Sequence, residues 1–253
     1  MATNPSVRTR LPQEPAPLSE GQRIGYIFFA PSRVFADLRR NASWLAPFLI
    51  VAVVSLLFFY VVDRKVSFPK VVENLIRLQP KQADRIDRLP ADQRDKVMAQ
   101  RVTITKIVSY AVPVITLVLY AVFAGVLFAT LKFSASADVK YKTLFAVVVY
   151  SRLPELLGFL LATLSLLAGV GRDAFNIENP LALNPGYFIG PSGSPVLRAL
   201  LTPLDAITIW TLVLTAIGIT HISKVKRGTA FAVVFGWSAF VVLARVALAA
   251  ATS

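Results

Sequence analysis

Four ionisable residues interrupt long apolar stretches of this sequence, and they are the side chains best placed to do chemistry: Arg152, Glu155, Asp205 and Arg245. An arginine or aspartate at the centre of a membrane-spanning helix costs roughly 2.5–3.5 kcal/mol, so such residues need a function or a partner. In a wet path between helices they could move protons or ions. Opposite charges at matched positions could instead neutralise each other and fix how the helices pack, and we favour this second interpretation.

Both pairs of opposite charge have spacings that allow an ion pair. Arg152 and Glu155 are three residues apart, so they lie on one face of a helix and can bond directly. Pro154 lies between them and weakens the helix because it lacks a backbone N–H donor. Asp205 and Arg245 lie in consecutive, antiparallel stretches at depths that agree within about 6 Å, at roughly 1.5 Å per residue, which predicts an ion pair between two helices.

Five apolar stretches must position these charges. Each has about 20 residues or more, enough for a helix to cross the roughly 30 Å hydrocarbon layer of a membrane. Backbone polar groups in that layer must be satisfied within the segment, so the stretches are expected to be helical. They cover residues 42–62, 107–131, 144–170, 196–220 and 230–250. The predicted fold class is therefore all-α: a polytopic protein with a five-span membrane domain over residues 44–250.

The composition agrees with a membrane protein and excludes several other classes. Of the 253 residues, 55% are hydrophobic and 16% charged, and the mean hydropathy of +0.62 excludes a disordered chain, a collagen-like chain and most soluble enzymes. Cysteine is absent, and the single histidine, His221, leaves little room for a histidine metal site or an ordinary catalytic triad. The P-loop, HExxH, GxSxG and GxGxxG motifs are also missing from the sequence. We therefore expect no enzyme activity, no cofactor and no metal site.

The formal net charge of +13 is assigned to anionic lipid headgroups rather than to nucleic acid, because basic residues lie beside the apolar stretches. The candidates for headgroup contact are Arg33, Arg39, Arg40, Lys224, Lys226 and Arg227. Basic residues divide equally between the two sides of the predicted membrane domain, but the turn that follows the fourth stretch is strongly basic and residues after 250 carry no basic side chain. This asymmetry predicts a protein of the cell (inner) membrane with a cytoplasmic N-terminus and a C-terminus outside.

The N-terminal region divides into two parts. Residues 1–20 are polar and rich in proline, which predicts a disordered tail. Residues 21–43 contain a helix that Pro31 can start. Its apolar side would carry Val34, Phe35 and Leu38, and its charged side Arg33, Asp37 and Arg40. Such an amphipathic segment is typical of a helix lying in the membrane surface, and a plain connector is the alternative.

Two long connections differ in character. In residues 63–106 the two charge signs interleave, and Asp84–Arg88 and Asp92–Lys96 have the acid-first spacing that supports a helix. Prolines break this segment, so we predict two or three short helices outside the bilayer, the last continuous with the second span. Its interleaved arginines favour a solvated surface over a metal site. Residues 171–195 are rich in glycine, proline and asparagine but also apolar, which predicts an irregular loop packed on the helix ends.

Four segments of the chain, taken in order, also carry a resemblance to a known family. They are 31–35 with Trp44–Leu45–Ala46–Pro47; the run 146–154, in which Tyr150 is followed shortly by Leu153–Pro154; Asn179–Pro180–Leu181–Ala182–Leu183–Asn184; and Leu204–Asp205 with Trp210, Gly218, Lys224 and Ala230. This order resembles the Yip-one family (Ypt/Rab-interacting proteins) in its bacterial branch. The resemblance implies a five-span helical protein with a cytoplasmic N-terminus; eukaryotic members are linked to vesicle traffic and GTPase partners. The sequence lacks the Asp-Leu-Tyr-Gly-Pro motif of those members, so Rab binding is not carried over.

These features together predict a non-enzymatic scaffold or adaptor that binds other membrane proteins or lipids. A small transporter or channel component that uses the intramembrane charges is the alternative, and lipid sensing or remodelling through residues 21–43 is a third possibility. The polar candidates within the spans are Tyr150, Arg152, Pro154, Glu155, Asp205, Trp210 and Arg245. The sequence leaves the oligomeric state and the identity of the partner open.

Overall fold

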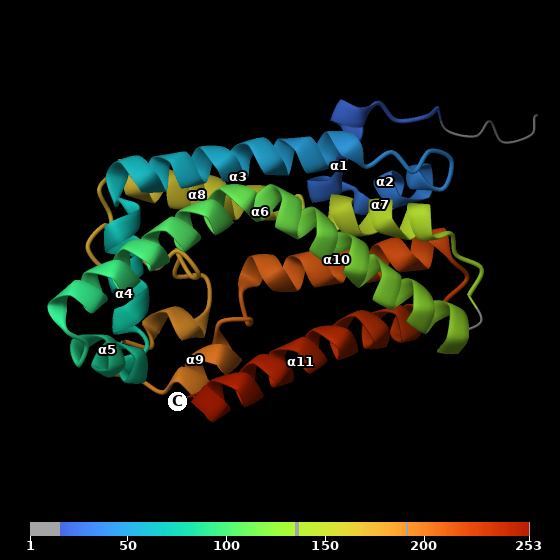
Figure 1. The fold of residues 1–253 in the computed structure, drawn as a ribbon. Helices are drawn as coiled ribbons and strands as arrows, with labels where there is room; N and C mark the ends of the chain where they lie inside the picture. The colour runs from blue at the N-terminus through green and yellow to red at the C-terminus, as the bar shows by residue number, and fades with distance from the viewer. Residues whose placement is uncertain (1–15, 135–136, 191, 253) are drawn as a thin grey trace, which may run out of the picture.

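The structure is a computed structural model that describes residues 16–134, 137–190 and 192–252, and every regular element in these ranges is a helix (Figure 1). The elements are α1 (Glu20–Phe29), α2 (Pro31–Leu38), α3 (Leu45–Lys65), α4 (Phe68–Arg77), α5 (Pro80–Asp87), α6 (Ala91–Ser134), α7 (Tyr141–Ser151), α8 (Glu155–Leu167), the short 3-10 helix η1 (Pro185–Phe188), α9 (Pro195–Leu201), α10 (Ala206–Ile222) and α11 (Arg227–Thr252). The all-α prediction is confirmed. Most of the predicted disordered tail, residues 1–15, lies outside the described residues.

The number of helices that could cross a membrane agrees with the predicted five spans. Four stretches of the described chain are long and apolar enough: α3, most of α6, α7 with α8, and α11. A fifth crossing results if α9 and α10, which are bent by 44° at a short break, are counted as one span. Pro203 lies in this break, and a proline lacks the N–H donor that a continuous helix would need there.

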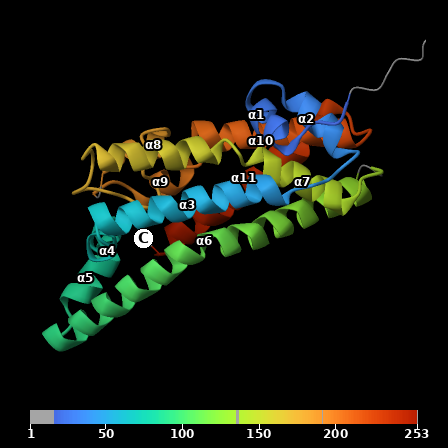
Figure 2. The same ribbon diagram turned by 90° about the horizontal axis from the view of Figure 1, so that it is seen from above.

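Helix α6 is far longer than a bilayer requires. Its 44 residues extend over about 66 Å, whereas the hydrocarbon layer is only about 30 Å thick. Its N-terminal part projects beyond the other long helices together with α5 (Figure 2). The last predicted extramembrane helix is therefore continuous with the second span, as the sequence indicated.

The core of the bundle is built around α7. Every residue from Leu144 to Ser151 is buried, as expected for a helix that is surrounded by other helices on all sides. Helix α10 approaches closely at Gly218, where an added Cβ would overlap Val147 and lie 3.1 Å from the Phe35 ring. The predicted apolar side of α2 is fully buried in this core.

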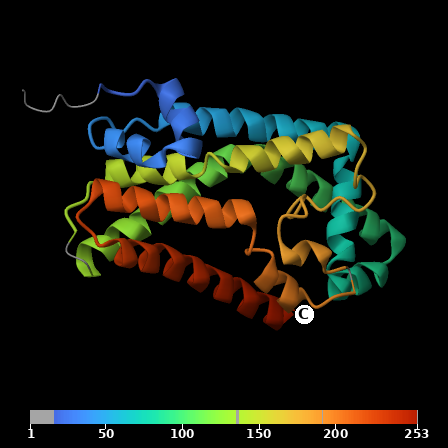
Figure 3. The same cartoon turned by 180° about the vertical axis from the view of Figure 1, so that it is seen from behind.

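The two ends of the bundle carry different elements. One end holds α1, α2 and the connections from α6 to α7 and from α10 to α11 (Figures 1 and 3). The other end holds α4, α5, α9 and the C-terminal end of α11. Elements that the sequence assigned to opposite sides of a membrane thus lie at opposite ends.

The irregular connection between α8 and α9 packs against the helices, as predicted. Phe175 is buried in a cluster with Phe58 and Leu166. Its backbone carbonyl accepts a hydrogen bond of 3.0 Å from Nδ2 of the buried Asn74 in α4. The connection therefore ties α4 to the ends of α3 and α8.

Candidate functional site

Arg152 and Glu155 form the predicted ion pair. Nη1 of Arg152 lies 3.2 Å from Oε1 of Glu155, and the exposed fractions of the two side chains are 20% and 28%. The Tyr120 hydroxyl donates to Oε2 of Glu155 at 2.8 Å, and the Arg152 guanidinium lies 5.5 Å from the centre of the Tyr120 ring. Helix α7 ends at Ser151 and α8 begins at Glu155, so the helix is interrupted next to Pro154, the residue predicted to weaken it. The pair is thus neutralised and also held by α6.

Three cavities on the described part of the chain do not reach this pair. Cavities of about 490, 900 and 540 Å³ open on the described part of the chain, and neither Arg152 nor Glu155 lines any of the three. Within the described residues, no group of three or more His, Cys, Asp or Glu side chains could hold a metal ion. The arrangement around Glu155 is that of a packed polar contact between helices.

The predicted ion pair between Asp205 and Arg245 is wrong. Asp205 is the N-cap of α10, and its Oδ1 accepts hydrogen bonds from the backbone N–H groups of Ile207 at 2.9 Å and Thr208 at 3.1 Å. Among the described residues neither Asp205 nor Arg245 takes part in a salt bridge. The prediction assumed one continuous fourth span, but the break before α10 exposes N–H groups that need an acceptor, and Asp205 supplies it.

The end of the bundle that holds α1 and α2 contains a buried ionic cluster that the sequence analysis did not predict. The Arg23 side chain is only 2% exposed, and its Nε donates to Oδ2 of Asp37 at 2.7 Å. Its Nη1 lies 3.1 Å from Oε1 of Glu20, and the other oxygen of Glu20 accepts from the Tyr150 hydroxyl at 2.6 Å. Residues from α1, α2 and α7 therefore share one network.

The charge state of Arg23 follows from this network. Burial lowers the pKa of Arg23, but the hydrogen bonds with Asp37 and Tyr150 and the charges of Asp37 and Glu20 raise it further than burial lowers it. Arginine is already protonated at every physiological pH, so this cation is permanent. A permanent buried cation requires the carboxylates that surround it.

Asp37 corrects a second sequence assignment. We placed it with Arg33 and Arg40 on the charged side of α2, but only the two arginines are exposed and Asp37 is 7% exposed. The reason is that α1 folds back beside α2 and brings Arg23 to it. A signal for this burial existed, because Arg23 precedes the buried Ile27 by four residues and so shares its face of α1.

Tyr150 and Trp210, which lie in segments that carry the family resemblance, both contact α1. Tyr150 is fully buried and bonds to Glu20, as described above. Trp210 of α10 packs edge-on against Phe28 with ring centres 5.8 Å apart. Both residues therefore join the N-terminal helices to the bundle.

The six basic candidates for lipid contact are exposed: Arg33, Arg39, Arg40, Lys224, Lys226 and Arg227. Arg33 lies on α2, and Arg39 and Arg40 directly follow it. Lys224 and Lys226 lie on the connection from α10 to α11, and Arg227 begins α11, at the same end of the bundle (Figure 3). Contact with headgroups stays a prediction for them.

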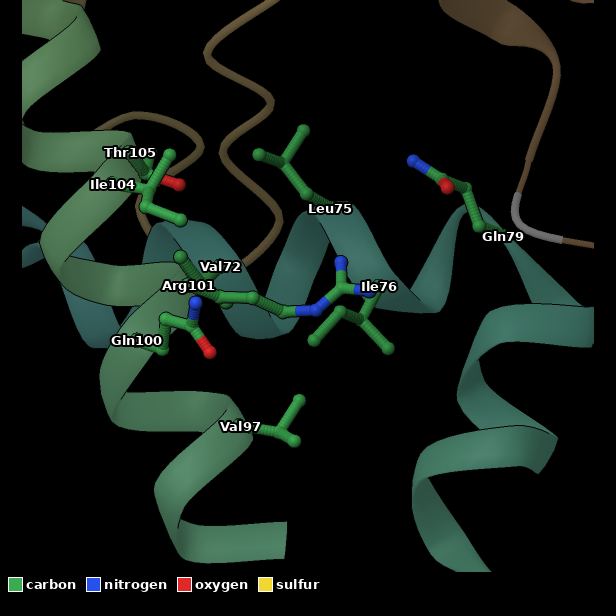
Figure 4. A pocket seen from close by; sticks show the side chains of 9 residues that line it. All are labelled: Val72, Leu75, Ile76, Gln79, Val97, Gln100, Arg101, Ile104 and Thr105. Atoms are coloured by element: carbon green, nitrogen blue, oxygen red, sulfur yellow. The ribbon is translucent and has the colours of Figure 1, made fainter.

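A groove lies between α4 and α6, within the segment 63–106. It has a volume of about 490 Å³ (Figure 4). Its walls are Val72, Leu75, Ile76 and Gln79 from α4 and Val97, Gln100, Arg101, Ile104 and Thr105 from α6. The Arg101 side chain extends from α6 towards Ile76 across the groove. Aliphatic walls with a few polar groups suit an apolar helix face better than a small charged solute.

Comparison with known proteins gives one match. A family model described as the Yip1 domain matches residues 25–248. Neither the curated proteins nor the solved structures contain a match to the chain.

Proposed function

The chain belongs to the Yip1 domain family, and from this membership and its surfaces we propose that it is a non-enzymatic scaffold or adaptor that binds another membrane protein through its extramembrane segment. It is a multi-pass membrane protein with helices that are long and apolar enough to cross the bilayer several times. The observation that carries the proposal is the groove between α4 and α6.

The groove has apolar walls, and in this proposal it lies outside the bilayer, where lipid does not cover it. Ile104 is half exposed and Val97 is partly exposed, and both lie on the N-terminal part of α6, which projects beyond the other long helices. Leu75 and Ile76 of α4 line the same groove and are also partly exposed. Contiguous apolar surface of this kind in water marks an interaction site. A partner helix with aliphatic residues spaced three and four apart would fill it, and an acidic residue on that helix would pair with Arg101.

The alternative function, a small transporter or channel component, has less support. Ion conduction needs a polar path, whereas Glu155 is paired with Arg152 and lines none of the three cavities. Asp205 is occupied as a helix cap. The paired charges favour the scaffold because they hold helices together without leaving a path for ions.

Site-specific photo-crosslinking in native membranes tests the scaffold. A photoreactive amino acid at Gln100, in the groove, should yield an adduct with one defined membrane protein, identified by mass spectrometry. The same group at Ala99, which is exposed on α6 but does not line the groove, should not. Ile76→Glu should abolish the Gln100 adduct, whereas Gln93→Glu, outside the groove, should retain it. Equal adducts at Gln100 and Ala99, or an adduct that survives Ile76→Glu, would contradict the proposal.

A further inference from the structure

A second cleft has a volume of about 900 Å³ and is lined by residues of α5, α9 and α11. Figures 1 and 3 show that the C-terminal part of α11 and α9 lie at the same end of the bundle. The cleft is bounded by α5, α9, the C-terminal part of α11 and the connection between α8 and α9. Neither Arg152 nor Glu155 lines this cleft. Of the residues that line the groove between α4 and α6, only Leu75 and Gln79 also line the cleft.

The cleft gathers positive charge from three separate helices. Lys81 of α5, Arg198 of α9 and Arg245 of α11 line it, and among its lining residues the one carboxylate is Glu178. Nη1 of Arg198 donates to the backbone carbonyl of Leu78 at 3.0 Å and Nη2 to that of Gly190 at 2.7 Å. These carbonyls fix the guanidinium in place without neutralising its charge, and in the described chain Arg198 takes part in no salt bridge.

Beside Arg245, the wall supplied by α11 consists of the apolar residues Leu248 and Ala249. Leu248 lines the cleft and is 66% exposed, and it continues a surface of Phe240, Val241 and Leu243 that is also exposed on this helix. Because α11 is apolar enough to span the bilayer and is hardly covered by protein, lipid chains are the natural neighbours of this surface.

Arg245 lies near the C-terminal end of the α11 span. Arg245 precedes the end of the α11 span at Ala251 by six residues, which is about 9 Å at roughly 1.5 Å per residue. An arginine at that depth reaches the interface with its flexible stem. The cleft thus presents guanidinium and ammonium groups beside a surface for acyl chains.

We propose that this cleft binds an anionic phospholipid of the leaflet on the C-terminal side, with its phosphate held by Arg245, Arg198 and Lys81. Arginine matches phosphate oxygens with parallel N–H donors, and basic pockets between membrane helices bind anionic headgroups. The acyl chains lie along α11 at Leu248. The lipid joins α5, α9 and α11, whose ends meet here. This site would exist whether or not a protein occupies the groove between α4 and α6.

Native mass spectrometry of the full chain in detergent tests this site. Phosphatidylglycerol should remain bound at lower concentrations than phosphatidylcholine with the same acyl chains. Removing two charges with Lys81→Gln and Arg245→Gln should weaken phosphatidylglycerol binding by roughly five-fold for each charge. Arg94→Gln, which removes an exposed charge of α6 outside the cleft, should leave binding unchanged, and Arg245→Lys should retain most of it. Unchanged unfolding temperatures would establish that each variant is folded.

Three outcomes would overturn the lipid site. The first is equal binding of phosphatidylglycerol and phosphatidylcholine by the wild-type chain. The second is a preference for phosphatidylglycerol that persists in the Lys81→Gln, Arg245→Gln double variant. The third is complete displacement of phosphatidylglycerol by millimolar glycerol phosphate, which would assign the cleft to a water-soluble phosphate ester.

Discussion

Nε of Arg23 donates to Oδ2 of Asp37 at 2.7 Å, and this bond joins α1 to α2 in an interior where both side chains are buried. Glu20 extends the network to Tyr150 of α7. The two N-terminal helices are therefore attached to the bundle by buried polar contacts as well as by the apolar side of α2. The Arg33 side chain, by contrast, is exposed on the opposite side of α2.

Breaking the pair of Arg23 and Asp37 should strongly destabilise the fold. Asp37→Ala leaves the buried Arg23 cation without its nearest carboxylate, and we expect a loss of about 3–5 kcal/mol in the free energy of unfolding. The matched control Arg33→Ala, on the exposed side of α2, should change it by less than about 0.5 kcal/mol. Chemical unfolding in detergent, followed by tryptophan fluorescence, measures both.

Replacing both charges is a sharper test of the same pair. The double variant Arg23→Met, Asp37→Leu leaves no buried cation without a carboxylate, so it should be more stable than Asp37→Ala alone. Arg23→Met and Asp37→Leu are also made singly. If their two effects on the free energy of unfolding add up to the effect of the double variant, the coupling between Arg23 and Asp37 is absent.

The contact of α10 with α7 and α2 should depend on the missing side chain at Gly218. Gly218→Ala places a methyl group against Val147 and Phe35 in a closely packed core, and we expect a destabilisation of about 1–3 kcal/mol. Gly236→Ala is the control, because a Cβ at Gly236 of α11 meets nothing within 4 Å. Thermal unfolding in detergent should separate the two variants, and equal unfolding temperatures would show that the close approach at Gly218 is not required.

The role of Asp205 as a helix cap predicts a difference between two substitutions. Asp205→Asn keeps a side-chain oxygen that can accept from Ile207 and Thr208, so stability should be nearly unchanged. Asp205→Ala removes the acceptor and should cost about 1 kcal/mol. If Asp205 instead formed an ion pair, both substitutions would remove the charge and would destabilise the protein equally. Unfolding midpoints of the three proteins decide between a cap and an ion pair.

The contact between Arg152 and Glu155 should matter for stability and not for ion flux. Glu155→Gln loses the ionic part of the contact but can still accept from the Tyr120 hydroxyl, so we expect a destabilisation of about 1 kcal/mol. Proton flux in proteoliposomes should equal that of empty liposomes for both proteins. A wild-type flux above this background that disappears in Glu155→Gln would reinstate the transporter.

The proposed orientation can be tested by labelling single cysteines, since the chain has none of its own. Ala99→Cys, on the extramembrane part of α6, should react with an impermeant maleimide added to intact cells. Thr229→Cys, near the connection from α10 to α11, should react only after the cells are opened. The reverse pattern would mean that the N-terminus lies outside.

Much of the architecture was accessible from local sequence properties. The five apolar stretches coincide with the helices or helix pairs observed to within three residues at each overhanging end, and residues 63–106 give α4, α5 and the start of α6. The bond between Arg152 and Glu155 was also predictable, because a spacing of three residues brings two side chains together at a helix break regardless of what surrounds it.

The contacts between distant residues were not accessible in this way. Depth alone matched Asp205 with Arg245, but the break before α10 turned Asp205 into a cap. Arg23 and Asp37 looked like surface charges until the fold-back of α1 beside α2 placed them face to face.

What the sequence by itself determined is where the chain must be helical and apolar, since a bilayer leaves no other way to satisfy the backbone and this requirement acts on each segment separately. Only the tertiary structure decided which ionised side chains meet, because that choice depends on where helices break and how they pack against each other. It also decided where Lys81, Arg198 and Arg245 converge, from three helices that no local pattern relates.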